Sequence, residues 1–175
     1  MKLLTVTVPC YNSAEYMEKC IESLLPGGED VEIIIVNDGS KTADETFKQA
    51  LKYDNVTILN HLVNKGKGAA LKTAFKYIES LDYKDKIIVT ADADGQHRPK
   101  DIFKVASYYK KVKKGVVLGS RQFDGKVPLR SRFGNDATKF LYRMFNNKKL
   151  HDNQTGLRAF GCDLIPFMLS IEGDR

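Results

Sequence analysis

The chain has 175 residues, of which 42% are hydrophobic and 29% are charged, and its formal net charge is +6. This length and composition are typical of one folded domain and exclude a disordered or collagen-like protein. The longest unbroken aliphatic run, Ile33–Val36, is far shorter than the roughly 20 apolar residues of a membrane-spanning helix.

The chain alternates between strand-like and helix-like patterns. Residues 3–8 alternate in hydrophobicity and predict a strand, and the apolar β-branched residues 31–36 predict another. Between them, Asn12 and Glu15 have the spacing of a capping box for a helix. Further along, the patterns predict helices with inward positions over 43–51, 71–81 and 102–109, and strands at 56–59, 87–90 and 116–119.

This alternation predicts an α/β fold with a mostly parallel central sheet and helices on both faces. Functional loops in such sheets follow the carboxyl ends of the strands. The alternation stops after Ser120: residues 121–150 predict a loop and a basic amphipathic helix, and residues 155–169 predict a last strand and helix. We expect one domain over residues 1–175, continuing past the end, because residues 171–175 are neither a capped helix nor a disordered tail.

Positive charge is concentrated in one segment. Residues 98–149 contain 15 Lys and Arg against three Asp and Glu, a net charge of +12. Such a segment attracts phosphate-bearing partners, whether nucleic acid, anionic lipid or phosphorylated substrate. For the lysines of residues 110–114 a simpler explanation is a solvated helix end, where cations favour the helix dipole.

An acidic motif follows the strand predicted at 87–90. Asp92 and Asp94 are two residues apart on an extended segment, so their carboxylates project to the same side, and Gln96 extends that face. Hard oxygen ligands of this kind suit Mg²⁺ or Mn²⁺ carrying a diphosphate. The alternative is that both aspartates are turn residues before the next helix.

Three other motifs follow predicted strands. Residues 9–12 offer an aromatic ring and an amide for a nucleotide base, and residues 37–40 offer an acidic group for a ribose or base edge. Residues 64–68 place lysines and glycines at a helix start, where an anion is favoured. Each motif alone is also explained as an ordinary connection or turn. The absence of GxxxxGK[ST] and GxGxxG motifs argues against an ATPase or an NAD-dependent dehydrogenase.

Taken together and in this order, the motifs resemble the inverting nucleotide-sugar glycosyltransferases of family 2. The matching stretches are Val8–Asn12, Val36–Ser40, Asn64–Ala70 and Asp92–Gly95. The resemblance implies the Rossmann-like GT-A fold, with a nucleotide-sugar half over about residues 1–97 and an acceptor half over about 98–175. It also implies that the nucleotide sugar is held by Pro9, Tyr11, Asn12, Asp38, Lys65, Gly66 and Asp92.

Motifs in the second half resemble the polyprenol-phosphate sugar transferases. They are Asp94–His97, Gly119–Arg121, Pro128–Arg130, Asn135 and Asp152–Arg158. The resemblance implies Mg²⁺ or Mn²⁺ on Asp94 and Gln96, and an acceptor phosphate bound by Arg121 and by Arg130 or Arg132, between which spacing does not decide. It implies catalytic roles for Asp92, Asp94, Arg121 and Arg158.

The predicted protein is therefore a metal-dependent enzyme that transfers a sugar from a UDP- or GDP-sugar to a polyprenyl phosphate. Residues 1–4 lead straight into a strand without a secretory signal, so we expect the protein on the cytoplasmic side. The basic segment 98–149 and the polyprenyl phosphate acceptor place it at the face of an anionic membrane, in cell-envelope synthesis. The sequence leaves open which sugar and base the donor carries, and whether the protein is a homo-oligomer.

Three alternatives accompany this prediction. In the first, the enzyme is a family 2 glycosyltransferase whose acceptor is a saccharide hydroxyl, in wall or surface polysaccharide synthesis. A hydroxyl acceptor requires a carboxylate base to take its proton, whereas an ionised phosphate does not. A nucleotidyltransferase would share the sheet and the metal carboxylates. A nucleic-acid-binding protein would need basic and aromatic residues on one exposed surface, whereas the acidic residues here gather at strand ends, so we expect no nucleic-acid partner.

We expect no catalytic or metal-binding role for the three cysteines and the three histidines. Cys10, Cys20 and Cys162 include no CxxC pair, so neither a disulfide framework nor a zinc site is predicted. No Ser or Cys nucleophile arrangement accompanies His61, His97 or His151, and we do not expect them to be catalysts.

Overall fold

The computed structural model of the chain describes residues 4–41, 47, 50–81, 83, 85–93, 97–120 and 155–173. Among these residues, strands form one sheet in the order β3-β2-β1-β4-β6-β5. Its strands are β1 (Leu4–Cys10), β2 (Val31–Asp38), β3 (Val56–His61), β4 (Ile87–Thr90), β5 (Val117–Leu118) and β6 (Arg158–Gly161). Most of the helix predicted over 43–51, and the loop and basic helix predicted over 121–150, lie outside the described residues.

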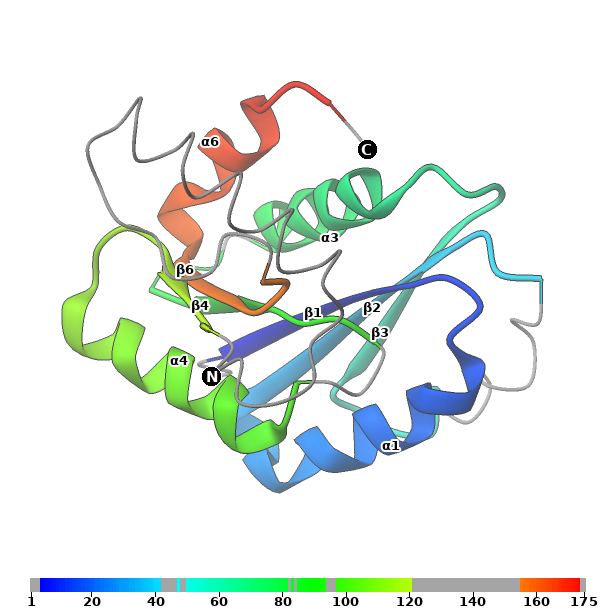
Figure 1. Cartoon of the computed structure of the whole chain (residues 1–175), viewed down its shortest axis with the longest axis horizontal. Coiled ribbons are helices and arrows are strands. Elements are labelled where there is room, and N and C mark those ends of the chain that lie inside the picture. The colour runs from blue at the N-terminus through cyan, green and yellow to red at the C-terminus, as the bar shows by residue number, and fades with distance from the viewer. Residues whose placement is uncertain are drawn as a thin grey trace, which may run out of the picture.

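Helices cover both faces of this sheet. The described helices are α1 (Ala14–Leu24), α3 (Lys67–Ser80), α4 (Pro99–Val112) and α6 (Ile165–Ser170), with 3₁₀ turns at Leu25–Asp30 and Cys162–Leu164. Figure 1 shows α3 and α6 on one face of the sheet and α1 and α4 on the other. The predicted α/β architecture is therefore confirmed. In the described part of the chain, no helix combines the length and apolar character needed to span a bilayer.

The strand order reverses beside β1. The chain proceeds outward from β1 to β2 to β3 in parallel pairs, and α3 then returns so that β4 pairs with the other side of β1, again in parallel. The last two strands differ, because β6 is antiparallel to both β4 and β5. Ligands of doubly wound sheets bind at the carboxyl ends of the strands next to such a reversal.

The core explains the unbroken apolar run Ile33–Val36 in the middle of β2. All eight residues of β2 are buried, and Ile33–Val36 have no exposed surface, because helices cover a parallel strand on both sides. On the α3 face, Phe75 packs edge-to-face against Phe160 of β6, with ring centroids 5.6 Å apart. Cys10 lies in the core as an apolar residue, and burial raises the pKa of its thiol to about 12.

The capping box predicted at Asn12 is wrong. Helix α1 begins after Ser13 without a side-chain cap, and Asn12 has a left-handed backbone conformation with φ of 51°. Its Oδ1 instead accepts a hydrogen bond from the backbone N–H of Lys41, at 3.1 Å. Asparagine tolerates this conformation, so Asn12 joins the end of β1 to the loop after β2.

The lysines at the end of α4 have the simple role expected for them. Lys110 and Lys111 lie in the last turn, and Lys113 ends the helix in a left-handed conformation. Cations at this end of a helix interact favourably with its dipole.

A buried ion pair lies at the opposite edge of the sheet from the carboxyl ends of the parallel strands. Glu32 at the start of β2 accepts hydrogen bonds from Thr5 Oγ1 at 3.1 Å and from Lys86 Nζ at 3.3 Å. Both charged side chains are at most 6% exposed. Burial lowers the pKa of Lys86, although Glu32 partly opposes that shift. We interpret this pair as structural.

Candidate active site

The carboxyl ends of β1, β2 and β4 bring together three of the predicted motifs. In the sheet register, Cys10 is opposite Asn37, and Thr7 is opposite Thr90. The segments that follow these strands therefore leave the sheet at one edge. Residues 11–12, Asp38 and Asp92 all lie at this edge although they are far apart in the sequence.

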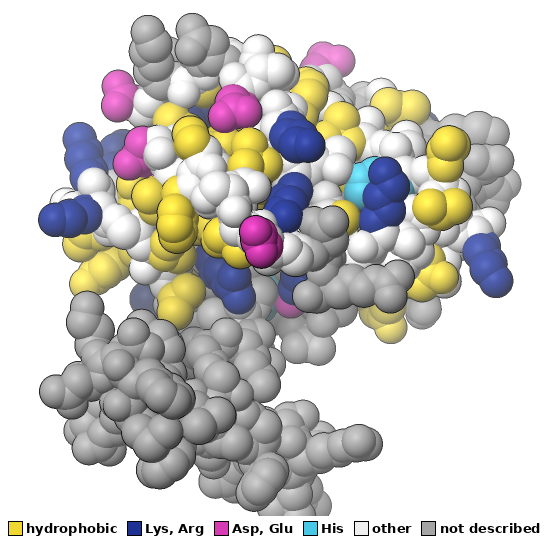
Figure 2. All heavy atoms as spheres, turned by 90° about the horizontal axis from the view of Figure 1, so that it is seen from above, with side chains coloured by type: hydrophobic (Ala, Val, Ile, Leu, Met, Phe, Trp, Pro, Cys, Tyr) yellow, Lys and Arg dark blue, Asp and Glu magenta, His cyan; other side chains and the backbone are white. Residues whose placement is uncertain are grey.

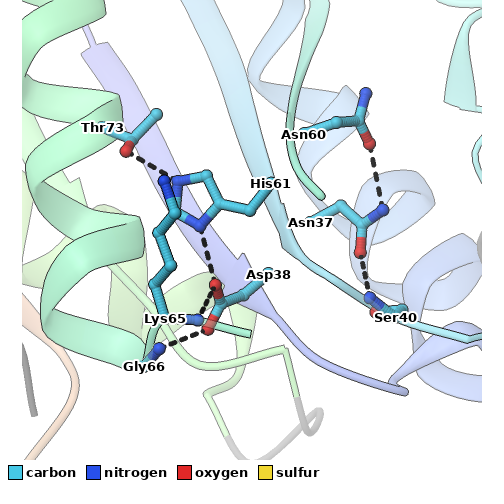
Figure 3. A network of polar contacts seen from close by, with 8 residues as sticks. All are labelled: Asn37, Asp38, Ser40, Asn60, His61, Lys65, Gly66 and Thr73. Carbon is cyan, nitrogen blue, oxygen red and sulfur yellow. Dashed lines mark hydrogen bonds and ion pairs between the residues drawn. The ribbon is translucent and has the colours of Figure 1, made fainter. Parts of the chain in front are cut away.

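Asp38 is the most fully bonded of these side chains (Figure 3). Its Oδ1 accepts the backbone N–H of Lys65 at 2.9 Å, and its Oδ2 accepts the backbone N–H of Gly66 at 2.8 Å. Oδ1 also lies 2.7 Å from His61 Nδ1. Burial alone would raise the pKa of Asp38, but these hydrogen bonds outweigh it and lower the pKa below the ordinary value. Asp38 is therefore an ionised carboxylate that holds the loop of residues 62–66.

A second polar network joins the ends of β1 and β2. Asn37 Nδ2 donates to Asn60 Oδ1 at 3.0 Å, and Asn37 Oδ1 accepts the N–H of Ser40 at 3.0 Å (Figure 3). Ser40 Oγ in turn accepts the N–H of Asn12 at 2.9 Å. Tyr11, which follows β1, is 45% exposed and therefore accessible to a ligand. Pro9 is part of β1, where it pairs with Val36.

Asp92 lies just beyond β4, between the ammonium group of Lys67 and the imidazole ring of His97. It forms an ion pair with Lys67 of α3, and its Oδ2 lies 3.4 Å from His97 Nε2. The hydrogen bond from His97 is the largest cause of a pKa lowered to about 2, and Lys67 adds to the shift despite partial burial. Asp92 is therefore ionised. Its side chain is also 29% exposed, so a ligand can reach the carboxylate.

A glycine gives Asp92 its space. A Cβ added to Gly156 would lie 2.2 Å from Asp92 Oδ2, a distance that no side chain tolerates. The carbonyl of Gly156 accepts a hydrogen bond from Thr90 Oγ1 at 2.7 Å, which ties the segment before β6 to the end of β4. Arg158 is opposite Thr90 in the sheet, is exposed, and donates from Nε to the carbonyl of Thr155 at 3.1 Å.

A cavity of about 440 Å³ adjoins this edge between α3 and α6. Lys67, Thr90, Gly156 and Arg158 line it, together with apolar residues that include Leu71 and Met168. Figure 2 views the face that carries α3 and α6, where hydrophobic side chains lie among Lys and Arg. Another cavity, of about 530 Å³, lies at the opposite edge near Lys86 and contains none of the predicted site residues.

The described residues thus include part of the predicted site. Pro9, Tyr11, Asn12, Asp38, Lys65, Gly66, Asp92 and Arg158 are described, whereas Asp94, Gln96, Arg121, Arg130 and Arg132 lie outside the described residues. No group of three or more His, Cys, Asp or Glu able to hold a metal occurs among the described residues. The Asp92 carboxylate, accessible and ionised, is nonetheless a hard oxygen donor of the kind that Mg²⁺ and Mn²⁺ prefer.

Several contributors were not identified from sequence. The sequence patterns give no chemistry to His61, contain Thr73 and Gly156 only within longer segments, and include Lys67 only in the anion-binding segment 64–68. His61 ends β3 as Asp38 ends β2, and the register of these parallel strands, which local patterns do not give, places the two residues side by side.

Comparison with known proteins identifies the fold and the family. The family described as "Glycosyl transferase family 2" matches residues 5–171. An uncharacterised protein of Methanocaldococcus jannaschii is 37% identical over 175 residues, covering 97% of this chain and 70% of that protein. A UDP-N-acetylglucosamine–dolichyl-phosphate N-acetylglucosaminyltransferase of Methanococcus voltae is 34% identical over 179 residues, covering 91% of this chain and 69% of that enzyme.

Among solved structures, the chain is similar to glucosyl-3-phosphoglycerate synthase from Mycobacterium tuberculosis in complex with Mn²⁺, UDP and phosphoglyceric acid. The TM-score is 0.70 at 18% identity, covering 93% of this chain and 57% of that one. The likeness confirms the predicted GT-A fold.

Proposed function

The chain belongs to glycosyl transferase family 2, and we propose that it transfers a sugar from a UDP- or GDP-sugar to a polyprenyl phosphate, inverting the anomeric carbon. The name of the Methanococcus voltae relative, which combines a UDP-sugar donor with dolichyl phosphate, supports this choice of donor and acceptor. We propose a single catalytic domain with its nucleotide-sugar half over about residues 1–97 and its acceptor half over about 98–175, acting at the cytoplasmic face of the membrane.

The observation that carries the proposal is the ionised Asp92 at the sheet edge beside the strand reversal. Asp92 has a pKa of about 2 and faces Lys67 at the start of α3. A carboxylate suits a metal, while a lysine and a helix start suit phosphate oxygens. Together they are the complementary halves of a site for a metal-bound diphosphate.

The nucleoside of the donor is assigned to the ends of β1 and β2. Tyr11 offers an exposed ring for stacking on a base. Asp38 uses three acceptor positions within the chain, and a carboxylate has about four, so Oδ2 retains one for a base N–H or a ribose hydroxyl. The proposed nucleotide contacts are Pro9, Tyr11, Asn12, Asp38, Lys65, Gly66 and Asp92.

The metal is assigned to the motif that begins at Asp92. Asp94 and Gln96 would hold Mg²⁺ or Mn²⁺ next to Asp92, and oxygens of the donor diphosphate would complete the coordination. When bound, the metal would neutralise charge on the departing nucleoside diphosphate.

The chain's basic residues are proposed to serve the transfer itself. An oxygen of the acceptor phosphate forms the bond to the anomeric carbon as the bond to the donor diphosphate breaks, and the nucleoside diphosphate leaves with that electron pair. Arg121 and Arg158 would stabilise the charge that develops on the diphosphate. Arg121, with Arg130 or Arg132, would hold the acceptor phosphate, which is already ionised and needs no general base.

Two measurements test the function. Thermal-shift assays with UDP- and GDP-sugars, with and without Mn²⁺, should show stabilisation by one donor class that requires the metal. Transfer assays should then compare a polyprenyl phosphate with saccharide acceptors. Transfer to a saccharide hydroxyl alone would reject the acceptor while keeping the family. Stabilisation by neither donor class would reject the donor assignment.

A further inference from the structure

We propose that His61 and Thr73 are positioning residues for the nucleotide: they fix the Asp38 carboxylate, which in turn holds the loop of residues 62–66 at the nucleotide site. The inference rests on the proposed function, because that function assigns the nucleotide to the sheet edge where Asp38 lies. Neither residue needs to contact the substrate for this role.

His61 lies between the two side chains it connects (Figure 3). Its Nδ1 is 2.7 Å from Asp38 Oδ1 and its Nε2 is 2.8 Å from Thr73 Oγ1 on α3. The side chains of His61 and Asp38 are 6% and 5% exposed. Water therefore has little access to either bond, and a partner lost here is not easily replaced.

The chemistry of the three groups defines the proton on the ring. Asp38 is ionised and can only accept, so Nδ1 of His61 carries the hydrogen that it donates. In the neutral ring, Nε2 then accepts from the hydroxyl of Thr73. Asp38 thus sets the tautomer of His61, and the hydroxyl of Thr73, which can donate or accept, fixes the rotation of the ring from its other side.

The loop that Asp38 holds is poorly fixed by packing. Leu62 is fully exposed and Val63 is 63% exposed, so neither side chain anchors the loop in the core. The loop is instead attached through the N–H groups of Lys65 and Gly66, both bonded to Asp38. On its other side it lies directly on Gly39, where an added Cβ would be 2.5 Å from the backbone nitrogen of Asn64.

Loop position has a consequence beyond Asp38. Helix α3 begins at Lys67, immediately after Gly66, and Lys67 pairs with Asp92. The hydrogen bonds of Asp38 therefore set where α3 starts and where its first lysine lies. His61 connects the same helix to Asp38 through Thr73, so one network holds both the nucleoside and the diphosphate sides of the site.

Two pairs of variants in the full-length enzyme test the role. His61→Phe fills the space without a donor, whereas His61→Asn keeps an N–H near the position of Nδ1. Thr73→Val removes only the hydroxyl, whereas Thr73→Ser keeps it. Calorimetry with UDP and GDP in the presence of Mn²⁺, donor KM and kcat, and the melting temperature are measured for each.

We expect His61→Phe to weaken nucleotide binding and raise donor KM by about tenfold or more, with a smaller change in kcat, because a hydrogen bond to a buried charge is lost. Thr73→Val should do the same more weakly. His61→Asn and Thr73→Ser should each restore much of the affinity. Amide exchange at Lys65 and Gly66 should accelerate in the two disruptive variants alone.

The outcomes separate the two hypotheses. If the unmodified enzyme bound neither UDP nor GDP, the proposed function would fail and this inference with it. If it bound one of them and both disruptive variants bound it equally well, the function would stand and the positioning role would be wrong. Should His61→Phe not fold, Thr73→Val and Thr73→Ser decide alone, because their shapes differ little from threonine.

Discussion

Asp38 and His61 face each other from neighbouring parallel strands, at paired positions of β2 and β3, with Oδ1 and Nδ1 2.7 Å apart. The contact directs the carboxylate toward the backbone of Lys65 and Gly66. Asp38, proposed to contact the nucleotide, is therefore also a structural anchor for the loop of residues 62–66. Its removal should affect both stability and binding.

Replacing Asp38 by Asn tests this double role. The amide cannot accept hydrogen bonds at both ends, so at least one of the donors from Lys65, Gly66 and His61 loses its acceptor. We expect a loss of about 1 to 3 kcal/mol in the free energy of unfolding, together with weaker nucleotide binding. Urea unfolding and calorimetry measure the two effects. Asp54→Asn, at an exposed position, is the matched control and should change neither.

The pH dependence of stability should carry the signature of Asp38. Its pKa is lowered in the folded chain, so it binds protons less readily than in the unfolded chain, where the value is near 3.8. The stabilisation is then complete above that value and is lost as pH falls through the lower, folded pKa. Unfolding free energies at about pH 7 and about pH 3 should show the gap between the native chain and Asp38→Asn shrinking in acid. An equal gap at both would contradict this.

The fold could be predicted because its signals are local. The apolar run of β2 and the single apolar faces of α3 and α4 follow from burial on both sides of a parallel sheet, and each is visible within a short stretch. Parallel strands share a carboxyl edge, so the order of strands and helices also predicts that the motifs after β1, β2 and β4 meet.

The contacts that organise the site could not be predicted in this way. Asp38 and His61 are 23 residues apart, and their pairing depends on the register of β3 beside β2. Asn12 fitted a local capping pattern, yet its side chain bonds to Lys41 across 29 residues. For Asn12, a tertiary hydrogen bond replaced the contact that the local pattern predicted. For Asp38 and His61, no local pattern indicated the hydrogen bond.

Gly156→Ala should disable the site without disrupting the sheet. The new Cβ would overlap the Asp92 carboxylate, which would have to rotate away from Lys67 and His97. We expect transfer activity to fall by at least about a hundredfold, since misplacing a reacting group by about 1 Å has effects of this size. Gly119→Ala is the control, because its Cβ would press on the Leu157 side chain and not on Asp92. Comparable losses in both variants would point to a general packing defect.

The buried pair of Glu32 and Lys86 should matter for stability and not for catalysis. Lys86→Met leaves Glu32 charged and buried, with the Thr5 hydroxyl as its remaining hydrogen-bond partner among the described residues, at a cost of about 3 to 5 kcal/mol. Adding Glu32→Gln should recover part of this loss, because the unpaired charge is gone. Denaturant unfolding measures both variants. Donor KM of the folded fraction should stay unchanged, since the pair lies at the opposite edge of the sheet from Asp92.

Lys67→Met should show the reverse pattern. Lys67 is 54% exposed, and solvent-exposed ion pairs contribute only about 0 to 1 kcal/mol, so the melting temperature should barely move. If Lys67 leaves Asp92 to contact the donor diphosphate once the metal is bound, its loss removes a charge-assisted contact in a partly shielded site. Donor KM should then rise by about tenfold, the equivalent of about 1.4 kcal/mol. Lys76→Met, on the exposed side of the same helix, supplies the comparison and should leave KM as it was.

The metal requirement gives a second test of Lys67. Because Lys67 also neutralises Asp92, Lys67→Met should need less Mn²⁺ for half-maximal activity. A higher Mn²⁺ requirement would mean that Lys67 assists metal binding instead of competing with it.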